Sequence, residues 1–291
     1  MRRSLLFIPG NNPAMLQNAD VFGSDAVIFD LEDAVSVSEK DSARNLVSYF
    51  LTSITNYPIE IVIRINGLDT SFYEEDLNQI VSDQIDTIML PKANINDLKK
   101  LDFILSSLEK DKKMTKKIKI IPIIELASSV LEVDQIASLP RVNGILLGAE
   151  DLTSDLEIER TKLGTELAYP RSRIIYACHA YKIDAIDTPF TDTTDEEGLK
   201  KDTLVAKSLG MKAKAAIHPN QIDTINNVFN PSQKELNWAL KVITSNKEAL
   251  SKGIGVFSLD GKMIDKPVIE RADKIIQKAK KYHLLEANDE E

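Results

Sequence analysis

The chain is poor in the residues that build disulfides, zinc sites and nucleotide-binding loops. It has one cysteine, Cys178, so an internal disulfide is excluded. Its 3 histidines are too few and too scattered for the ligand clusters that bind zinc. None of its 11 glycines builds a Walker loop, or a G-x-G-x-x-G motif after an expected strand, so the sequence does not indicate a dedicated nucleotide pocket.

Long apolar runs and an excess of basic residues are also missing. No run approaches the ~20 apolar residues of a membrane span, and the one after Met1–Ser4 meets Pro9-Gly10 too soon for a signal peptide. We therefore expect a cytoplasmic protein with no membrane partner. A net charge of -9 argues against nucleic-acid binding, which favours a basic face.

Short apolar segments alternate with segments of helical periodicity from the start of the chain. The apolar segments predict eight strands, at Leu5–Ile8, Ala26–Phe29, Ile59–Asn66, Thr87–Leu90, Ile118–Ile124, Ile145–Leu147, Ile183–Asp187 and Lys214–Ile217. A helical segment follows each one. Eight such units predict an α/β fold, a (β/α)8 TIM barrel over residues 1–230. A doubly wound open sheet is the alternative fold, but it gives no reason why the number of strand–helix units should be eight.

Residues 231–291 form a C-terminal appendage to this barrel. The pattern predicts a helix over Gln233–Leu250, a hairpin that turns at Asp260-Gly261, and an amphipathic helix over Val268–Lys281. No linker composition separates the appendage, so we expect it to belong to the same structural unit as the barrel. The acidic end, Asn288–Glu291, is expected to be disordered.

Charged and polar side chains follow most of the predicted strands. In a parallel barrel the carboxyl ends of all strands meet at one mouth, where the active sites of such enzymes lie. So many charges at one place are unfavourable unless they pair or hold an ion. The set comprises Asp30, Glu32, Asp33, Arg64, Asn66, Lys92, Glu125, Glu150, Asp151, Asp187 and His218.

Two of these carboxylates, Glu125 and Asp151, follow neighbouring strands. Side-by-side carboxylates give oxygen-only ligation, which suits Mg²⁺ completed by substrate oxygens and water. The stretch Gly148-Ala149-Glu150-Asp151 has a simpler interpretation, in which its two acids only cap the next helix. Its position as the sixth strand end, one unit after Glu125, favours the metal site.

Arg64, at the end of the third strand, is a candidate for binding a substrate carboxylate. Its planar fork of N–H groups matches a carboxylate in a bidentate way. The alternative is an internal salt bridge to Glu32 or Asp33. For Lys92 we prefer a structural role, paired with those same acids.

The ordered set of motifs resembles the citrate lyase β subunit family, within the HpcH/HpaI-type aldolases. The similarity covers nearly the whole chain, and each motif alone is weak, but their order is specific. The motifs are Arg3-Ser4-x-Leu6-Phe7-x-Pro9-Gly10, Phe29-Asp30-Leu31-Glu32-Asp33-Ala34-Val35, Arg64-Ile65-Asn66, Leu90-Pro91-Lys92, Glu125, Leu147-Gly148-Ala149-Glu150-Asp151, Gly164-Thr165-Glu166-Leu167 and Gly261-Lys262-Met263-Ile264-Asp265-x-Pro267.

The resemblance implies a Mg²⁺-dependent barrel enzyme, usually a homotrimer, that joins or splits a 2-oxoacid and an acetyl thioester. By position, Glu125 and Asp151 match the metal ligands. Arg64, together with Glu125 and Ala149, matches the substrate-binding set. Asp265 matches an acid/base residue that a C-terminal lid delivers into a neighbouring subunit. The partners implied are the α subunit and the γ subunit, an acyl carrier protein, of a citrate lyase complex.

Three functional interpretations follow. The first is a lyase that cleaves a citryl thioester to oxaloacetate and an acetyl thioester, with Glu32 or Asp33 acting through a water as the base for the citryl hydroxyl. The second is a stand-alone malyl- or citramalyl-CoA lyase or thioesterase, which shares the metal and the arginine. The third is a scaffold subunit without activity. The convergence of acids with Arg64 and Asp265 argues against the scaffold.

Overall fold

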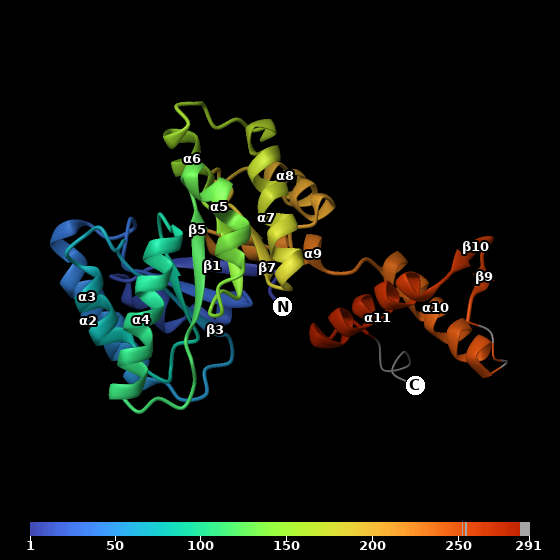
Figure 1. Ribbon diagram of the computed structural model, residues 1–291, viewed down its shortest axis with the longest axis horizontal. Coiled ribbons are helices and arrows are strands. Elements are labelled where there is room, and N and C mark those ends of the chain that lie inside the picture. The colour runs from blue at the N-terminus through green and yellow to red at the C-terminus, as the bar shows by residue number, and fades with distance from the viewer. Residues whose placement is uncertain (252, 254, 286–291) are drawn as a thin grey trace. The chain divides into compact units, whose positions relative to one another are not determined.

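Eight parallel strands form a closed barrel in the computed structural model, which describes residues 1–251, 253 and 255–285 (Figure 1). Their bounds are β1 Ser4–Pro9, β2 Ala26–Asp30, β3 Glu60–Arg64, β4 Thr87–Leu90, β5 Lys119–Ile124, β6 Gly144–Leu147, β7 Asp184–Asp187 and β8 Ala213–Ala216. Each strand pairs with the next, and β1 pairs with β8, with Leu5 opposite Ala215. This last pairing closes the sheet. It confirms the predicted (β/α)8 barrel and excludes the alternative, a doubly wound open sheet.

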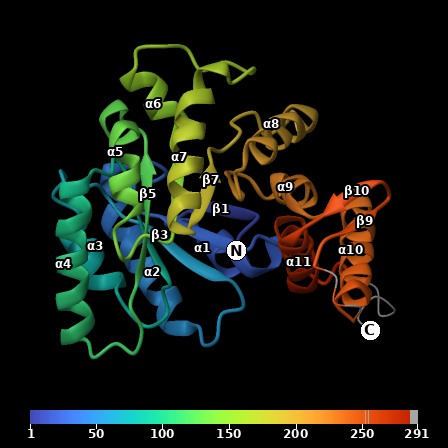
Figure 2. The same cartoon turned by 45° about the vertical axis from the view of Figure 1, so that its right-hand side comes forward.

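Helices follow the strands and surround the barrel (Figure 2). They are α1 Pro13–Gln17, α2 Lys40–Ser53, α3 Tyr73–Ile80, α4 Ile95–Asp111, α5 Ala127–Ala137, α6 Ala149–Asp155, α7 Ala168–Tyr181, α8 Glu196–Leu209 and α9 Ile222–Phe229. The sequence pattern predicts that the first helix runs from Pro13 to about Val21, but α1 ends at Gln17. The side chain of the C-cap residue Asn18 donates to the Ala14 carbonyl, and a 3-10 turn over Ala19–Phe22 follows.

The strands are buried on both faces, which explains their nearly continuous apolar sequences. One face of each strand fills the barrel interior, with side chains such as Ile28, Val62 and Ile121. The other face packs against the surrounding helices, as Val27 and Ile61 do. Within the described residues, no helix is both long enough and apolar enough to span a membrane.

A buried network of charges joins β7, β8, α7 and α8. Lys214 is fully buried and donates from Nζ to Asp187 at 2.7 Å, to Asp202 at 2.6 Å and to the Thr188 carbonyl at 2.7 Å. Arg171 donates to Asp187 at 2.8 and 2.9 Å and to Asp202 at 2.8 Å. Two cations thus face two carboxylates, so Asp187, which the sequence places at the mouth of the barrel, is occupied by structural partners.

Substituting Lys214 with methionine is expected to destabilise the protein strongly. The variant leaves Asp187 and Asp202 buried with only Arg171 to balance them, and breaking a buried ion pair in this way costs about 3–5 kcal/mol. Urea denaturation of the two proteins measures the difference. Lys201→Met, on the exposed face of α8, is the matched control and should change little. Equal stability of the two variants would contradict this account.

The described residues from 230 onward make a second compact unit, and the barrel unit is residues 1–229. This second unit contains α10 Gln233–Ser251, β9 Phe257–Leu259, β10 Lys262–Ile264 and α11 Lys266–Lys281. Its own core includes Val242, Ile264 and Ala272. The predicted hairpin is present and turns at Asp260 and Gly261, whose φ angles of 50° and 74° suit a two-residue hairpin turn.

Two predictions about this end of the chain are not tested. That the appendage and the barrel form one structural unit stays a prediction. The acidic residues 288–291, predicted to be disordered, lie outside the described residues.

Candidate active site

A cavity of about 290 Å³ opens where the carboxyl ends of the strands converge. It is lined by Phe7, Pro9, Asp30, Asp33, Ala34, Arg64, Ile123, Glu125, Leu146, Gly148, Ala149, Glu150, Asp151, Thr188, Pro189 and Ile217. Most of the predicted site residues of the barrel therefore surround one space, as expected for a parallel barrel. Of the block of acids after β2, Asp33 lines the cavity, and Glu32 contacts Arg64 beside it.

Glu125 follows β5 and is almost completely buried, with 4% of its surface exposed. Its Oε1 accepts a hydrogen bond of 2.5 Å from the backbone N–H of Lys92, after β4. Lys92 has a φ of 47°, in the left-handed region. Thus the backbone of Lys92, rather than its exposed ammonium group, contributes to the site, and sequence reasoning about its charge missed this role.

Gly148, after β6, provides the space that the Glu125 carboxylate occupies. A Cβ at this position would lie 2.5 Å from Glu125 Oε2 and 2.8 Å from both Glu125 Cβ and Ile123 Cγ2. These separations are shorter than any ordinary van der Waals contact. The glycine that follows β6 is therefore required by the side chain that follows β5.

Replacing Gly148 with alanine is expected to displace Glu125 and to lower activity by about tenfold or more. Overpacking of a filled site also costs about 1–3 kcal/mol of stability. Turnover and urea denaturation of Gly148→Ala measure both effects. Gly255→Ala is the control, because a Cβ at Gly255 meets nothing within 4 Å. Wild-type activity of Gly148→Ala would show that Glu125 need not hold its present position.

Glu150 and Asp151 lie in the first turn of α6, and both residues are exposed and line the cavity. The N-cap residue is Gly148, without a side-chain cap, so neither acid is the cap that the simpler interpretation proposed. Carboxylates in a first turn still interact favourably with the helix dipole. Both acids line the cavity, and their separate roles stay predictions.

Arg64 is held by Asp30, the last residue of β2. Its Nε and Nη2 donate to the two oxygens of Asp30 at 2.7 and 2.6 Å. Asp30 is fully buried and also accepts from the backbone N–H groups of Glu32 and Ala34. Burial would lower the pKa of the Arg64 guanidinium, but the hydrogen bonds and charge of Asp30 raise it above its ordinary value.

The internal salt bridge predicted for Arg64 is therefore present, but its main partner differs. Arg64 Nη1 lies 2.9 Å from Glu32 Oε2 and 3.6 Å from Asp33 Oδ2, whereas the bidentate contact is with Asp30. The bidentate contact orients the guanidinium, which still lines the cavity. Its predicted role in binding a substrate carboxylate is compatible with this geometry and stays a prediction.

Glu32 has an unusual environment beside Arg64. Its Oε2 is buried and forms the ion pair with Arg64 Nη1, but makes no hydrogen bond among the described residues. Burial raises the pKa of Glu32 to about 7, because the charges of Asp33 and Asp30 add to the effect and Arg64 only partly offsets it. The backbone around it is fixed by Lys40, which donates to the carbonyls of Leu31 and Glu32 at 2.8 and 2.7 Å.

The residues of the cavity fit a magnesium ion that is held in part by substrate. Burial raises the pKa of Glu125 to about 8; the Lys92 N–H opposes this rise, and the charges of Asp151 and Glu32 add to it. A divalent cation would relieve this crowding of negative charge. Across the described part of the chain, no group of three or more His, Cys, Asp and Glu side chains forms a cage. Two carboxylates therefore leave positions for substrate oxygens and water, as Mg²⁺ prefers.

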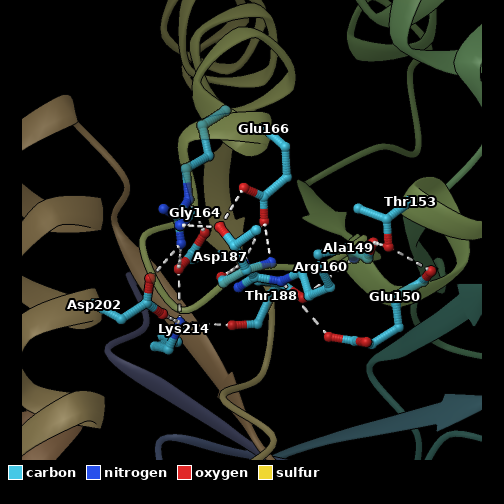
Figure 3. Close-up of polar contacts among 12 residues, drawn as sticks. Ala149, Glu150, Thr153, Arg160, Gly164, Glu166, Asp187, Thr188, Asp202 and Lys214 are labelled. Atoms are coloured by element: carbon cyan, nitrogen blue, oxygen red, sulfur yellow. Dashed lines mark hydrogen bonds and ion pairs between the residues drawn. The ribbon is translucent and has the colours of Figure 1, made fainter. Parts of the chain in front are cut away.

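The loop after α6 contacts the site through Arg160 (Figure 3). Its Nη1 donates to Glu166 Oε1 at 2.8 Å, and its Nε lies 3.6 Å from Glu150 Oε1. Burial would raise the pKa of Glu166, but hydrogen bonds from Thr161 and Arg160 lower it to about 2. Glu166 therefore keeps Arg160 in place, and Arg160 gives Glu150 a partner that Asp151 lacks in the described structure.

Some predicted strand-end residues lie outside the cavity lining. Asn66 donates to Asp76 at 2.7 Å, and His218 accepts from the N–H of Asn220 at 3.2 Å. Asp265 belongs to the second compact unit, where it caps α11 by accepting from the N–H of Val268 at 3.3 Å. Its predicted role in catalysis stays a prediction.

The barrel has acids and an arginine at the carboxyl ends of its strands, where the active sites of (β/α)8 barrel enzymes lie. The model of the HpcH/HpaI aldolase/citrate lyase family matches residues 3–219. The chain belongs to this family. The resemblance found from the sequence motifs is thereby confirmed.

Within the family, the chain is similar to citrate lyase β subunits. It is 42% identical over 290 residues to "Citrate lyase subunit beta" of Leuconostoc mesenteroides subsp. cremoris, covering 99% of this chain and 96% of that protein.

Two solved structures from Mycobacterium tuberculosis also match. CitE in complex with magnesium, acetoacetate and coenzyme A has a TM-score of 0.75 at 28% identity, covering 95% of this chain and 97% of that one. A citrate lyase β subunit complexed with oxaloacetate and magnesium has a TM-score of 0.65 at 28% identity, covering 79% and 97%.

Proposed function

We propose that this protein is the citryl thioester lyase of a citrate lyase complex. It cleaves a citryl thioester to oxaloacetate and an acetyl thioester. The observation that carries the proposal is the single cavity in which Arg64, Glu125 and Asp151 converge, in a chain 42% identical over nearly its whole length to a citrate lyase β subunit. The structural relative that contains magnesium and oxaloacetate supports the same chemistry.

The charged side of the cavity binds the oxaloacetate half of the substrate. Glu125 and Asp151 hold Mg²⁺, which, when bound, supplies positive charge beside the substrate oxygens. Arg64 binds a carboxylate of this half, and Asp30 fixes the direction in which its guanidinium points. Ala149, which lines the cavity beside Asp151, also contacts the substrate. The bond that breaks is thus oriented before the reaction begins.

Cleavage begins when a base removes the proton of the citryl hydroxyl. The C–O bond then becomes the ketone of oxaloacetate, the adjacent C–C bond breaks, and its electron pair forms the enolate of the acetyl thioester. Glu32 or Asp33, acting through a water, is the base. A pKa of about 7 gives Glu32 a suitable proton affinity near neutral pH. We therefore expect Glu32→Gln or Asp33→Asn to change the rate of cleavage relative to the unaltered protein. Unchanged rates in both variants would discard this assignment.

The enolate carbon then takes a proton from Asp265, which completes the acetyl thioester. In the reverse direction Asp265 removes the same proton. The family resemblance assigns Asp265 to a site in a neighbouring subunit, so the active enzyme is an oligomer, a homotrimer in the simplest case. The remaining partners are the α subunit and the γ subunit, the acyl carrier protein of the complex, and the protein acts in the cytoplasm.

A coupled assay tests the proposal. Purified protein receives Mg²⁺ and citryl-CoA or citryl carrier protein, and malate dehydrogenase with NADH reports the release of oxaloacetate. Oxaloacetate release that chelation of Mg²⁺ abolishes supports the proposal. Activity on malyl-type thioesters alone indicates the stand-alone lyase. The absence of activity on every thioester indicates the scaffold.

A further inference from the structure

The cavity has two chemically different sides. All of its charged lining residues end or follow β2, β3, β5 and β6, namely Asp30, Asp33, Arg64, Glu125, Glu150 and Asp151. The opposite arc, formed by β7, β8 and β1, contributes Thr188, Pro189, Ile217, Phe7 and Pro9. On this second arc, the hydroxyl of Thr188 is the one polar side chain among the lining residues.

Thr188 is held in place both at its backbone and at its side chain. Its carbonyl accepts from Lys214 Nζ at 2.7 Å, which ties it to the buried charge network. Its Oγ1 accepts from the backbone N–H of Ala149 at 3.2 Å, where α6 begins. Figure 3 shows Thr188 between Lys214 and Ala149. The residue is 1% exposed, so its hydroxyl is fixed without free access to solvent.

The hydrogen of this hydroxyl has no acceptor within the described residues. Oγ1 acts only as an acceptor there, in its contact with Ala149. A threonine hydroxyl has one hydrogen to donate, and a buried donor without an acceptor costs free energy. An acceptor that enters the cavity would remove this cost. The charged arc binds the oxaloacetate half of the substrate. The atom that accepts a hydrogen bond from Thr188 therefore belongs to the other half of the substrate.

We infer that the Thr188 hydroxyl donates a hydrogen bond to the thioester oxygen of the substrate. This inference rests on the proposed function and deepens it. When the C–C bond breaks, its electron pair moves into the thioester group and negative charge develops on that oxygen. A donor already fixed at this position stabilises the enolate more than the uncharged thioester, because it needs no reorganisation when the charge forms. Thr188 transfers no proton in this step.

Thr188→Val and Thr188→Ser test the inference. Valine keeps the branched shape and removes the hydroxyl, whereas serine keeps the hydroxyl. In the coupled assay with citryl-CoA and Mg²⁺, Thr188→Val should lower kcat by about a hundredfold, as loss of one such donor does. Thr188→Ser should recover most of the rate. A fall of less than tenfold for Thr188→Val, or equal losses in both variants, would overturn the inference.

A purely structural role of Thr188 predicts a different result. Loss of the Ala149 contact would shift α6 and with it Asp151, which would weaken binding of metal and oxoacid. Under the inference, by contrast, Thr188→Val should change two quantities by less than about twofold. They are the affinity for oxaloacetate and Mg²⁺ in a calorimetric titration, and the Mg²⁺ concentration that gives half of the maximal rate. If either weakens in parallel with kcat, Thr188 acts through α6 and the inference is wrong.

Two further outcomes complete the test. If Thr188→Val does not fold, by its melting curve, Thr188→Ala replaces it under the same criteria. If the unaltered protein cleaves no thioester, the proposed function fails and the inference falls with it. If the unaltered protein is active and the valine variant is equally active, only the inference fails.

Discussion

Asp151→Ala is expected to abolish Mg²⁺-dependent turnover, with a loss of at least about a hundredfold. In the proposed site Asp151 is one of two protein ligands to Mg²⁺, and the charge that the metal supplies is worth several kcal/mol in the transition state, where each 1.36 kcal/mol is tenfold in rate. Rates over a range of Mg²⁺ concentrations measure the effect. The Mg²⁺ concentration for half-maximal rate should rise at the same time as the maximal rate falls.

The neighbouring acid is the matched control for this experiment. Glu150→Gln should cost only a fewfold, because Glu150 is already paired with Arg160 at 3.6 Å, and the glutamine keeps its shape. Both acids occupy the first turn of the same short helix, so a general disturbance of α6 would affect both variants. Equal damage in the two variants would contradict the assignment of the metal to Asp151 rather than Glu150.

Asp265→Asn is expected to reduce turnover by about a hundredfold or more. General acid–base catalysis contributes about 10²–10⁴-fold, and an asparagine cannot supply the proton that the enolate carbon needs. Asp265 also caps α11 in the described structure. Asparagine is as good an N-cap as aspartate, so the substitution tests the chemistry and leaves the helix intact. Steady-state cleavage of citryl-CoA gives the rate.

Asp265→Ala separates the two functions of this residue. It removes the cap as well, which costs about 0.5–2 kcal/mol of stability. The asparagine and alanine variants should therefore share the loss of turnover and differ in melting temperature. Full turnover by Asp265→Asn would exclude Asp265 as the acid, and another residue would then have to protonate the enolate.

Much of the fold follows from the sequence because its signals are local. Short apolar runs such as Thr87–Leu90 specify buried strands, and eight repeats of the same unit specify a closed barrel. The hairpin likewise follows from Asp260-Gly261, since few residue pairs accept its φ angles. The first helix was predicted too long because Asn18 interrupts a pattern whose apolar spacing continues beyond it.

The mouth of the barrel was also predictable, because parallel strands bring their carboxyl ends together. Glu125 and Asp151 were thus expected to lie near one another, and both line the same cavity. The partner of each charged group was not predictable from position. Sequence reasoning offered Glu32 or Asp33 for Arg64, and only the folded barrel shows that Asp30, the fully buried last residue of β2, has the bidentate geometry.

The sequence by itself determined the order of the strands, the closed barrel and the acids and arginine at its mouth. Only the tertiary structure decided that Gly148 makes room for Glu125, that Asp187 is sequestered by Lys214, and that the Thr188 hydroxyl accepts from the N–H of Ala149 beside the cavity. The physical reason is that strand and turn signals are local. Hydrogen-bond partners and van der Waals space depend instead on side chains that are far apart in the chain and meet only when the barrel closes.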